Sequence, residues 1–524
     1  MLTAQALEPR PTGPRWIAVI IFVAFFVPTA LWSASTPLWA SPDENFHTLK
    51  AWSVAHGQFY VTPEAASSGT GGFVSVPQGL VDSAASITCL AFTPQANGSC
   101  VAIPTEDETI VRSANAAGRY NPVYYFVVGL PSLVTDLQHA PLAMRLASAA
   151  LFAFFASWAV SALAQSARPG VAVGAGMLAF TPMAVFLGGV VNPNGLEIAA
   201  SAALWANLGM FLHDGPRMTA SARGRLLRRA ALAASAMVVT RGLSPVWLVV
   251  IVSCCLLTGT RQSLRLMLTR PALRWVAFTA VVALLSLVWI VVSQSLKAGS
   301  VGSPVSHWLL DRLHIASSTQ EGKWRMAVGN FGWLDAPLPE FFTSAWLYVG
   351  LAVAALALVR ATAGMRVAIV AVGVASYILP VVLEAQSLDV TGVIWQGRYT
   401  LPLYVGVPIL AAVALGRSSR RLSVESAVAA LVAAVVALGI NVFGFAFALH
   451  RNTDGLFDGS GTTTPFTLDG PWQPRLGAVT SVLTYSAWVL GVAAVLGLVL
   501  WRAAPSAEGT MDPDDEDAWF AATV

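Results

Sequence analysis

Charged residues are scarce in this chain of 524 residues, because Asp, Glu, Lys and Arg together make up only 11% of it. A soluble domain averages about 25% charged residues. Hydrophobic residues account for 56% of the chain, so the composition excludes a soluble multidomain protein and indicates an integral membrane protein. The formal net charge is only +3, which gives no reason to expect a nucleic-acid partner.

Cysteine is also rare, with four residues in the whole chain. Cys254 and Cys255 lie inside an apolar run and are expected to be inert thiols. Cys89 and Cys100 lie in a long polar stretch. A disulfide between them is predicted if that stretch faces an oxidising compartment, and the alternative is a pair of free thiols.

Long apolar runs recur along the chain, and a helix needs about 20 mostly apolar residues to cross a bilayer. We predict an all-α membrane protein with about twelve membrane segments, at 16–37, 141–164, 170–190, 195–212, 230–240, 244–258, 275–296, 341–359, 367–385, 399–416, 424–448 and 477–501. Arginine is concentrated in five of the intervening segments, at 168, 217–229, 261–274, 360–366 and 417–421. The positive-inside rule places all five in the cytoplasm.

This topology divides the chain into three parts with both termini in the cytoplasm. A short N-terminal segment (1–15) precedes the membrane domain (16–501), and an acidic tail (502–524) follows it. The tail is rich in Asp and Glu and is expected to be disordered.

Residues 230–258 could form a single long span, but both of its flanks are basic. Two short segments that meet at Thr240–Pro245 would keep both flanks in the cytoplasm, and Gly242 and Pro245 supply the break. Interrupted helices are tolerated at membrane depth only where they are buried in protein or line a water-filled cavity. We therefore predict a broken hairpin at this place.

The polar stretches on the outer side are unequal. The first, 38–140, is much the largest, and the others are 297–340, 386–398 and 449–476. Loops of more than about 15 residues are uncommon and are often functional. The residues that could carry chemistry gather in these outer loops.

The first candidate motif, SPDENFHTLKAW, follows the first span and contains Asp43, Glu44 and His47. Proline followed by two acids is typical of an ordinary helix start. An acid pair at the mouth of a membrane cavity can instead act as a general base or hold a divalent cation. One acid pair is fewer ligands than a cation needs, so we predict no metal site, although a divalent cation is compatible with the pair.

Two further motifs flank the second span. The segment GRYNPVYYFVVGLPS contains Tyr124 and Tyr125, which could either anchor the chain at the membrane interface or contact a substrate. Arg145 stands at the outer start of the span that follows.

Two ionisable residues lie deeper. Glu197, in VNPNGLEIAAS, lies about one turn into the span 195–212, where an ionisable residue is a functional hypothesis by default. The alternative is a structural partner for Arg241 or Arg145. Arg241 lies in the broken segment, too far from the cytoplasmic flank to extend back to it, so we expect it to face a cavity or to pair with an acid.

The later outer loops add Asp335, in FGWLDAPLPEFF, and the motif VIWQGRYTLPL with Gln396, Arg398 and Tyr399. Arginine presents a forked donor that matches phosphate oxygens. The alternative for Arg398 is extension towards lipid headgroups. Acids after the first span, together with arginines at the outer or middle depth of three others, suit an anionic lipid-linked substrate held near a catalytic carboxylate.

This layout resembles the GT-C superfamily of membrane glycosyltransferases, in which an Asp or Asp-Glu follows the first span. NPVYY (121–125) and RLAS (145–148) look like segments of its aminoarabinose- and mannose-transferring branches. The chain is more closely similar to the bacterial membrane family called domain of unknown function 2142, through PDENFH, NPNGLE, GWLDAPLP and QGRYTLPL. It departs from the aminoarabinose branch in the insertion around 65–72, and in Tyr-Asn-Pro (120–122) where that branch has Lys-Pro-Pro, so the substrate of that branch is not carried over.

The resemblance implies a bacterial plasma-membrane enzyme that moves a sugar from a polyprenyl-phosphate donor to a cell-envelope glycan or glycolipid. Asp43 or Glu44 would act as general base, and Arg398 with Arg241 or Arg145 would neutralise the phosphate leaving group. In an in-line displacement the base and Arg398 would face each other across about one sugar ring without touching. His47, Tyr124, Tyr125, Glu197, Asp335, Gln396 and Tyr399 would line the substrate site. The expected partners are the lipid-linked donor, membrane lipids and the acceptor. A transporter or flippase of a lipid-linked or amphipathic substrate remains the alternative, since broken helices and buried arginines occur there as well.

Overall fold

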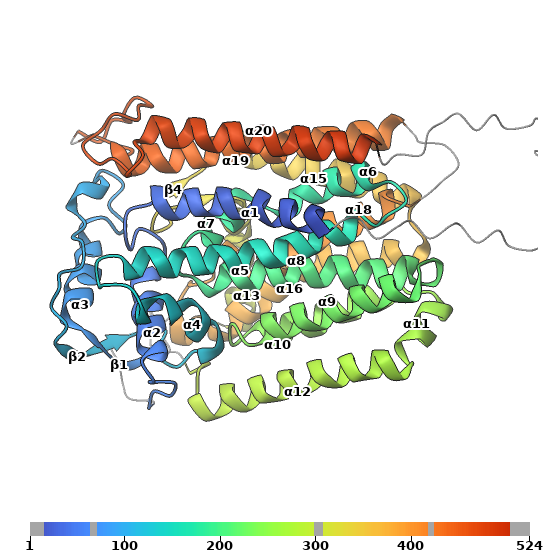
Figure 1. Ribbon diagram of the computed structural model, residues 1–524, viewed down its shortest axis with the longest axis horizontal. Helices are drawn as coiled ribbons and strands as arrows, with labels where there is room; N and C mark the ends of the chain where they lie inside the picture. Colours follow the sequence, from blue (N-terminus) through green and yellow to red (C-terminus); the bar gives the residue numbers. More distant parts are fainter. Residues whose placement is uncertain (1–14, 63–70, 298–307, 418–423, 459, 503–524) are drawn as a thin grey trace, which may run out of the picture.

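The computed structural model describes residues 15–62, 71–297, 308–417, 424–458 and 460–502. The predicted N-terminal segment and acidic tail, and most of the 65–72 insertion, lie outside these ranges. Figure 1 shows the long helices lying side by side along the longest axis of the molecule. Eight of the described helices are long and apolar enough to cross a membrane: α1 (Arg15–Ser35), α5 (Ala140–Leu163), α8 (Pro193–Asp214), α12 (Arg270–Ser293), α15 (Glu340–Arg360), α16 (Ala363–Thr391), α19 (Val424–Thr453) and α20 (Ala478–Arg502). The all-α membrane architecture is confirmed.

The predicted count of about twelve spans is not confirmed. The segment predicted at 170–190 consists of α6 (Pro169–Gly176), a 3-10 turn η4 (Met177–Ala179) and α7 (Pro182–Gly188), with a bend of 75° between the two parts. Counting that bent pair as one span gives nine among the described residues. The segment predicted at 399–416 forms the short helices α17 (Leu401–Tyr404) and α18 (Gly406–Leu415). Prolines at the start of α7 and α17 favour these breaks, because proline lacks the N–H that would continue a preceding helix.

The interruption predicted within 230–258 is present. Helix α9 (Ala220–Val238) ends at the break and α10 (Ser244–Leu257) begins after it, followed by α11 (Arg261–Met267). The hydroxyl of Thr240 donates to the Met237 carbonyl oxygen at 2.6 Å and lies 3.0 Å from the hydroxyl of Ser244. These side chains satisfy polar groups that the break leaves open, as a buried interruption requires.

The placement of both arginine-rich flanks of this hairpin in the cytoplasm stays a prediction. We expect single cysteines introduced at Ala222 and Leu268 to resist a membrane-impermeant thiol reagent in intact cells and to react after the cells are opened. Leu268 is 71% exposed, so its accessibility to the reagent is not limited by the fold. Labelling of either cysteine from outside would contradict the topology.

The loop 38–140, which we predict to be on the outer side, is folded rather than irregular. Its elements are α2 (Glu44–Ala55), β1 (Gly72–Pro77), α3 (Gln78–Ala85), η1 (Ser86–Cys89), η2 (Gly98–Cys100), β2 (Ile110–Asn115), α4 (Pro122–Gly129) and η3 (Leu130–Leu133). Strands β1 and β2 pair antiparallel, and Figure 1 shows α2, α3 and both strands gathered at one end of the helices. Cys89 and Cys100 form the predicted disulfide, with Cα atoms 6.3 Å apart, inside the ordinary range.

The remaining described elements are short. They are η5 (Gly215–Arg217), α13 (Leu309–Ser318), α14 (Gln320–Val328), the two-residue strands β3 (Asn330–Phe331) and β4 (Ala336–Pro337), and η6 (Gly397–Tyr399). The short helix η6 is the most important of these for the site, because it carries Arg398.

Helix α8 forms the centre of the bundle. Its whole apolar window is buried inside the protein, whereas only 11% of the corresponding window of α12 is buried. Protein rather than lipid therefore surrounds α8, and polar residues on it can find partners. Asn207, for example, donates to the carbonyl oxygens of Ala203 at 2.8 Å and Trp158 at 3.2 Å.

Candidate active site

Asp43 lies immediately before α2 in the left-handed region of backbone space, with φ 62°. Its side chain makes no capping hydrogen bond to the helix that follows. Instead the carboxylate accepts a hydrogen bond from Nη2 of Arg398 at 2.5 Å. The Asp43 side chain is 41% exposed, while that of Arg398 is 1% exposed. An ordinary helix start therefore does not account for Asp43, and its strained backbone is of the kind that clusters at functional sites.

Arg398 is held inside the protein, which rules out extension towards lipid headgroups. Its Nη1 donates to the Pro42 carbonyl oxygen at 3.2 Å, and the same oxygen accepts from Nδ2 of Asn192 at 3.0 Å. Three of the motifs, PDENFH, NPNGLE and QGRYTLPL, thus meet at one backbone carbonyl. Nε of Arg398 is buried without a hydrogen-bond partner among the described residues, so the guanidinium keeps a donor for a ligand.

The direct contact corrects one expectation. Asp43 and Arg398 were expected to face each other across about one sugar ring without touching, and they form an ion pair. Burial alone would raise the pKa of Asp43, but Arg398, with His47 and Arg241, lowers the pKa below its ordinary value of 3.8. The carboxylate is therefore ionised at neutral pH.

Arg241 supplies a second cation from the break between α9 and α10. Its guanidinium carbon lies 4.3 Å from the ring centre of Tyr399, and its Nη1 donates to Oδ1 of Asn194 at 2.5 Å. Asn194 in turn lies 3.5 Å from the carboxylate of Glu197, which also accepts from the hydroxyl of Ser244 at 2.7 Å. The buried Glu197 thus belongs to the network that holds Arg241.

His47 lies one turn after Asp43 on α2, against the aromatic segment. Its Nδ1 is 2.9 Å from the hydroxyl of Tyr125, and its ring stacks on those of Tyr120 and Tyr125. The hydroxyl of Tyr124 lies 3.0 Å from that of Ser148. Both Tyr124 and Tyr125 are buried, so their side chains pack inside the protein, which does not favour anchoring at a membrane interface.

The His47 ring should make stability depend on pH. Burial, with the nearby charges of Arg398 and Arg241, outweighs the attraction of Asp43 and lowers the pKa of His47 from 6.5 to about 3. The unfolded chain therefore takes up a proton below about pH 6.5 that the folded chain does not. Stability is retained above that pH and falls as the pH drops towards 3, by about 2 kcal/mol between pH 6.5 and 5.

We expect His47→Gln to lose about this much of the pH dependence, measured as the thermal unfolding midpoint at pH 7 and pH 5. The exposed His139→Gln is the matched control and should retain it. An unchanged dependence in His47→Gln would show that His47 takes up its proton in the folded state as well.

Glu44 and Arg145 pair with each other instead of facing the site. The Arg145 guanidinium makes five hydrogen bonds, two to the Glu44 carboxylate at 2.6 Å and three to the carbonyl oxygens of Ser33, Thr36 and Pro37. Both side chains are 1% exposed. Every N–H of the Arg145 guanidinium is used, so Arg145 keeps no donor for a phosphate, and of the two acids only Asp43 contacts Arg398.

Asp335 also lies outside the site. Its carboxylate accepts from Arg451 at 2.6 Å, and Arg451 also donates to the carbonyl oxygens of Leu90, Thr93 and Ala96. These contacts of Arg451 join the disulfide region and Asp335 to the end of α19, which gives Asp335 a structural partner away from Arg398. The sequence motifs did not point to Arg451, although an arginine in a segment predicted to lie on the outer side runs against the positive-inside bias.

Gln396 precedes η6, and its Oε1 is buried without a hydrogen-bond partner among the described residues. It lies two positions from Arg398 and keeps an acceptor for a ligand hydroxyl. No group of three His, Cys, Asp or Glu side chains that could hold a metal ion occurs in the described part of the chain.

The family model described as predicted membrane protein (DUF2142) matches residues 25–407. No curated protein matches the chain. Similar solved structures include two of ArnT from Cupriavidus metallidurans, one bound to undecaprenyl phosphate and one in the apo state. The first is 14% identical with a TM-score of 0.43 and covers 94% of this chain and 73% of that chain. The second is 15% identical with a TM-score of 0.44 and covers 93% and 72%.

Proposed function

The chain belongs to the family of predicted membrane proteins DUF2142, and from the geometry of its outer site we propose that it is a membrane glycosyltransferase of the GT-C type. The proposed donor is a polyprenyl-phosphate sugar and the acceptor an extracytoplasmic glycan or glycolipid. The observation that carries the proposal is the pair of a partly exposed, ionised Asp43 and a buried Arg398. A base and an anion-binding cation are the two groups that such a transfer requires.

The donor phosphate binds Arg398 and Arg241, the first with its unpaired Nε and the second stacked on Tyr399. Asp43 accepts the proton of the acceptor hydroxyl, whose oxygen bonds to the anomeric carbon. The bond from that carbon to the phosphate oxygen breaks, and polyprenyl phosphate leaves with its negative charge held by the arginines. The attack is in line, so the anomeric configuration inverts.

The ion pair between Asp43 and Arg398 describes the protein without substrate. A donor phosphate bound at the unpaired Nε gives Arg398 a second anion, so the guanidinium holds the Asp43 carboxylate at Nη2 less strongly. The carboxylate can then turn towards the acceptor.

The test begins with donor binding. Purified protein in lipid nanodiscs is titrated with undecaprenyl phosphate, the product half of the donor, and binding is read by native mass spectrometry. We expect Arg398→Gln to weaken binding by about tenfold or more, because charge-assisted bonds to the phosphate are lost. Arg475→Gln, at an exposed arginine in an outer loop, is the matched control.

The second part of the test distinguishes a glycosyltransferase from a transporter. A panel of radiolabelled polyprenyl-phosphate monosaccharides is incubated with membranes that contain the protein, and an enzyme releases free polyprenyl phosphate. Movement of an intact lipid-linked sugar between leaflets without that release would replace the glycosyltransferase with a flippase. The interruption between α9 and α10 is also compatible with a flippase. The hydroxyls of Thr240 and Ser244 at this break, however, hydrogen-bond each other, and Ser244 also donates to Glu197.

A further inference from the structure

A buried ion pair between α14 and α16 has no part in the reaction proposed above. The ammonium group of Lys323 on α14 donates to the carboxylate of Glu384 on α16. The two side chains are 4% and 0% exposed. Replacing a buried ion pair with well-packed apolar residues is often neutral or stabilising, because both charges lose their hydration on burial. Stability alone therefore does not explain why the chain has this pair.

The second carboxylate oxygen of Glu384 binds the loop that carries the site. Its Oε1 accepts the backbone N–H of Trp395 at 3.0 Å, while its Oε2 accepts from Lys323. Two residues further along, a Cβ atom on Gly397 would lie only 2.0 Å from the carbonyl oxygen of Lys323, so the main chain of η6 packs directly on that of α14. Arg398 is the next residue. Glu384 and Lys323 therefore hold the loop at two points just before Arg398.

The side chain of Trp395 links this backbone contact to the two arginines. Its Nε1 donates to the hydroxyl of Thr400 at 2.9 Å, and its ring meets the ring of Tyr399 edge-on, with centres 5.9 Å apart. The centre of the Tyr399 ring lies 4.3 Å from the guanidinium carbon of Arg241 and 5.3 Å from that of Arg398. An aromatic face attracts a guanidinium at such distances. A shift of Trp395 would therefore move the ring that both guanidinium groups contact.

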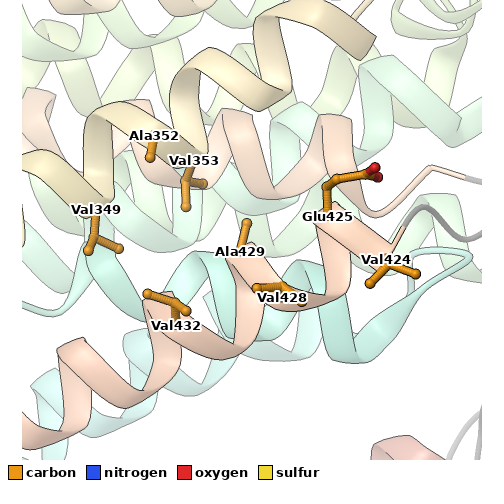
Figure 2. A pocket seen from close by; sticks show the side chains of 8 residues that line it. All are labelled: Val349, Ala352, Val353, Val424, Glu425, Val428, Ala429 and Val432. Carbon is orange, nitrogen blue, oxygen red and sulfur yellow. The ribbon is translucent and has the colours of Figure 1, made fainter.

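An exposed ion pair elsewhere on the bundle provides the comparison. The crevice between α15 and α19 encloses about 430 Å³ and has Glu425 at one end (Figure 2). Glu425 pairs with Arg360, the last residue of α15, and the two side chains are 69% and 31% exposed. The first residue of α15, Glu340, pairs with Arg325 on α14. Arg360 therefore lies about 30 Å along α15 from the contact with α14, far from the loop that carries Arg398.

We propose that Glu384 and Lys323 are positioning residues of the donor phosphate site, which set the orientation of Arg398 and Tyr399 through Trp395. This rests on the proposed function, because the pair has this role only if Arg398 binds the donor phosphate. A carboxylate accepts a backbone N–H more strongly than a neutral group does, and Lys323 keeps the carboxylate ionised and in place. The guanidinium is then oriented before the donor arrives, so less conformational freedom is lost on binding.

The experiment uses two double variants that remove the ion pair without leaving a buried charge. Lys323→Met with Glu384→Gln keeps an amide oxygen that can accept the N–H of Trp395. Lys323→Met with Glu384→Leu removes that acceptor as well. Arg360→Met with Glu425→Leu removes the exposed pair and is the matched control.

Three properties of each full-length protein are measured in lipid nanodiscs. Binding of undecaprenyl phosphate is read by native mass spectrometry, and the thermal unfolding midpoint reports stability. Hydrogen exchange of the segment 392–400 reports whether the loop is still held.

We expect the double variant with Glu384→Leu to bind undecaprenyl phosphate about tenfold more weakly than the wild type, and its segment 392–400 to exchange faster. The double variant with Glu384→Gln and the control should both bind within about threefold of the wild type. A merely structural role would instead lower the unfolding midpoint and leave binding by the folded protein unchanged.

Trp395→Leu is a second variant that leaves the ion pair intact and decides the matter if the double variant with Glu384→Leu does not fold. It should weaken binding by about fivefold, because Tyr399 loses its neighbouring ring. Equal binding by the two Lys323 double variants, or binding by Trp395→Leu equal to that of the wild type, would overturn the inference and leave the transferase proposal standing. Failure of the wild type to bind undecaprenyl phosphate would overturn the proposed function, and the inference with it.

Discussion

Replacing Asp43 by Asn should reduce sugar transfer by at least about 100-fold, since a positioned general base contributes 10²- to 10⁴-fold. Asparagine keeps the volume of aspartate and tolerates the left-handed backbone at this position. The variant should therefore fold, and the loss of sugar transfer would then result from the missing general base. The measurement is release of polyprenyl phosphate from a labelled lipid-linked sugar.

The same substitution should leave lipid binding in place or tighten it, because the carboxylate no longer competes for Arg398. This separates a base from a residue that merely holds Arg398, since the latter would lose binding as well as turnover. Asp107→Asn, at an exposed aspartate of the first outer loop, is the control and should transfer normally. Full transfer by Asp43→Asn would remove the central residue of the proposal.

Arg145→Met should destabilise the fold by about 3–5 kcal/mol, the cost of removing one partner of a buried ion pair. The change leaves the Glu44 carboxylate without its cation and three carbonyl oxygens without their donor. The measurement is the midpoint of thermal unfolding of purified protein in a mild detergent.

The matched control is Arg312→Met. Arg312 pairs with Asp389 at 3.1 Å, but the two side chains are 22% and 47% exposed, and pairs of this kind contribute about 0–1 kcal/mol. A loss in Arg145→Met no larger than that of Arg312→Met would mean that Glu44 and Arg145 are free to serve the substrate after all.

Local pattern predicted the parts of the fold that depend on local chemistry. Apolar runs located the long helices, and Gly242 and Pro245 with basic flanks located the break between α9 and α10. The disulfide followed from two cysteines in one polar loop. The number of spans did not follow, because hydropathy does not show that residues 170–190 bend by 75° or that 401–415 is too short.

The sequence predicted which residues belong to the site better than it predicted which of them pair with each other. Sequence motifs singled out Asp43, Arg398, Arg241 and Tyr399, which the fold brings together. Two neighbouring acids look alike in a sequence, and only the fold shows that Glu44 turns towards Arg145 while Asp43 turns towards Arg398. Long-range contacts decide such pairings, since Glu44 and Arg145 are 101 residues apart.

The complete burial of α8 inside the protein has a consequence for its insertion into the membrane. Transfer of a helix from the translocon into lipid depends on its apolarity, and ionisable or amide side chains make that transfer less favourable. The window of α8 has a mean hydropathy of 1.3, against 2.6 for α12, and α8 carries Glu197, Asn194 and Asn207. We therefore expect α8 to leave the translocon only together with its packing partners α5 and α9, so biogenesis of the whole protein waits on the synthesis of α9.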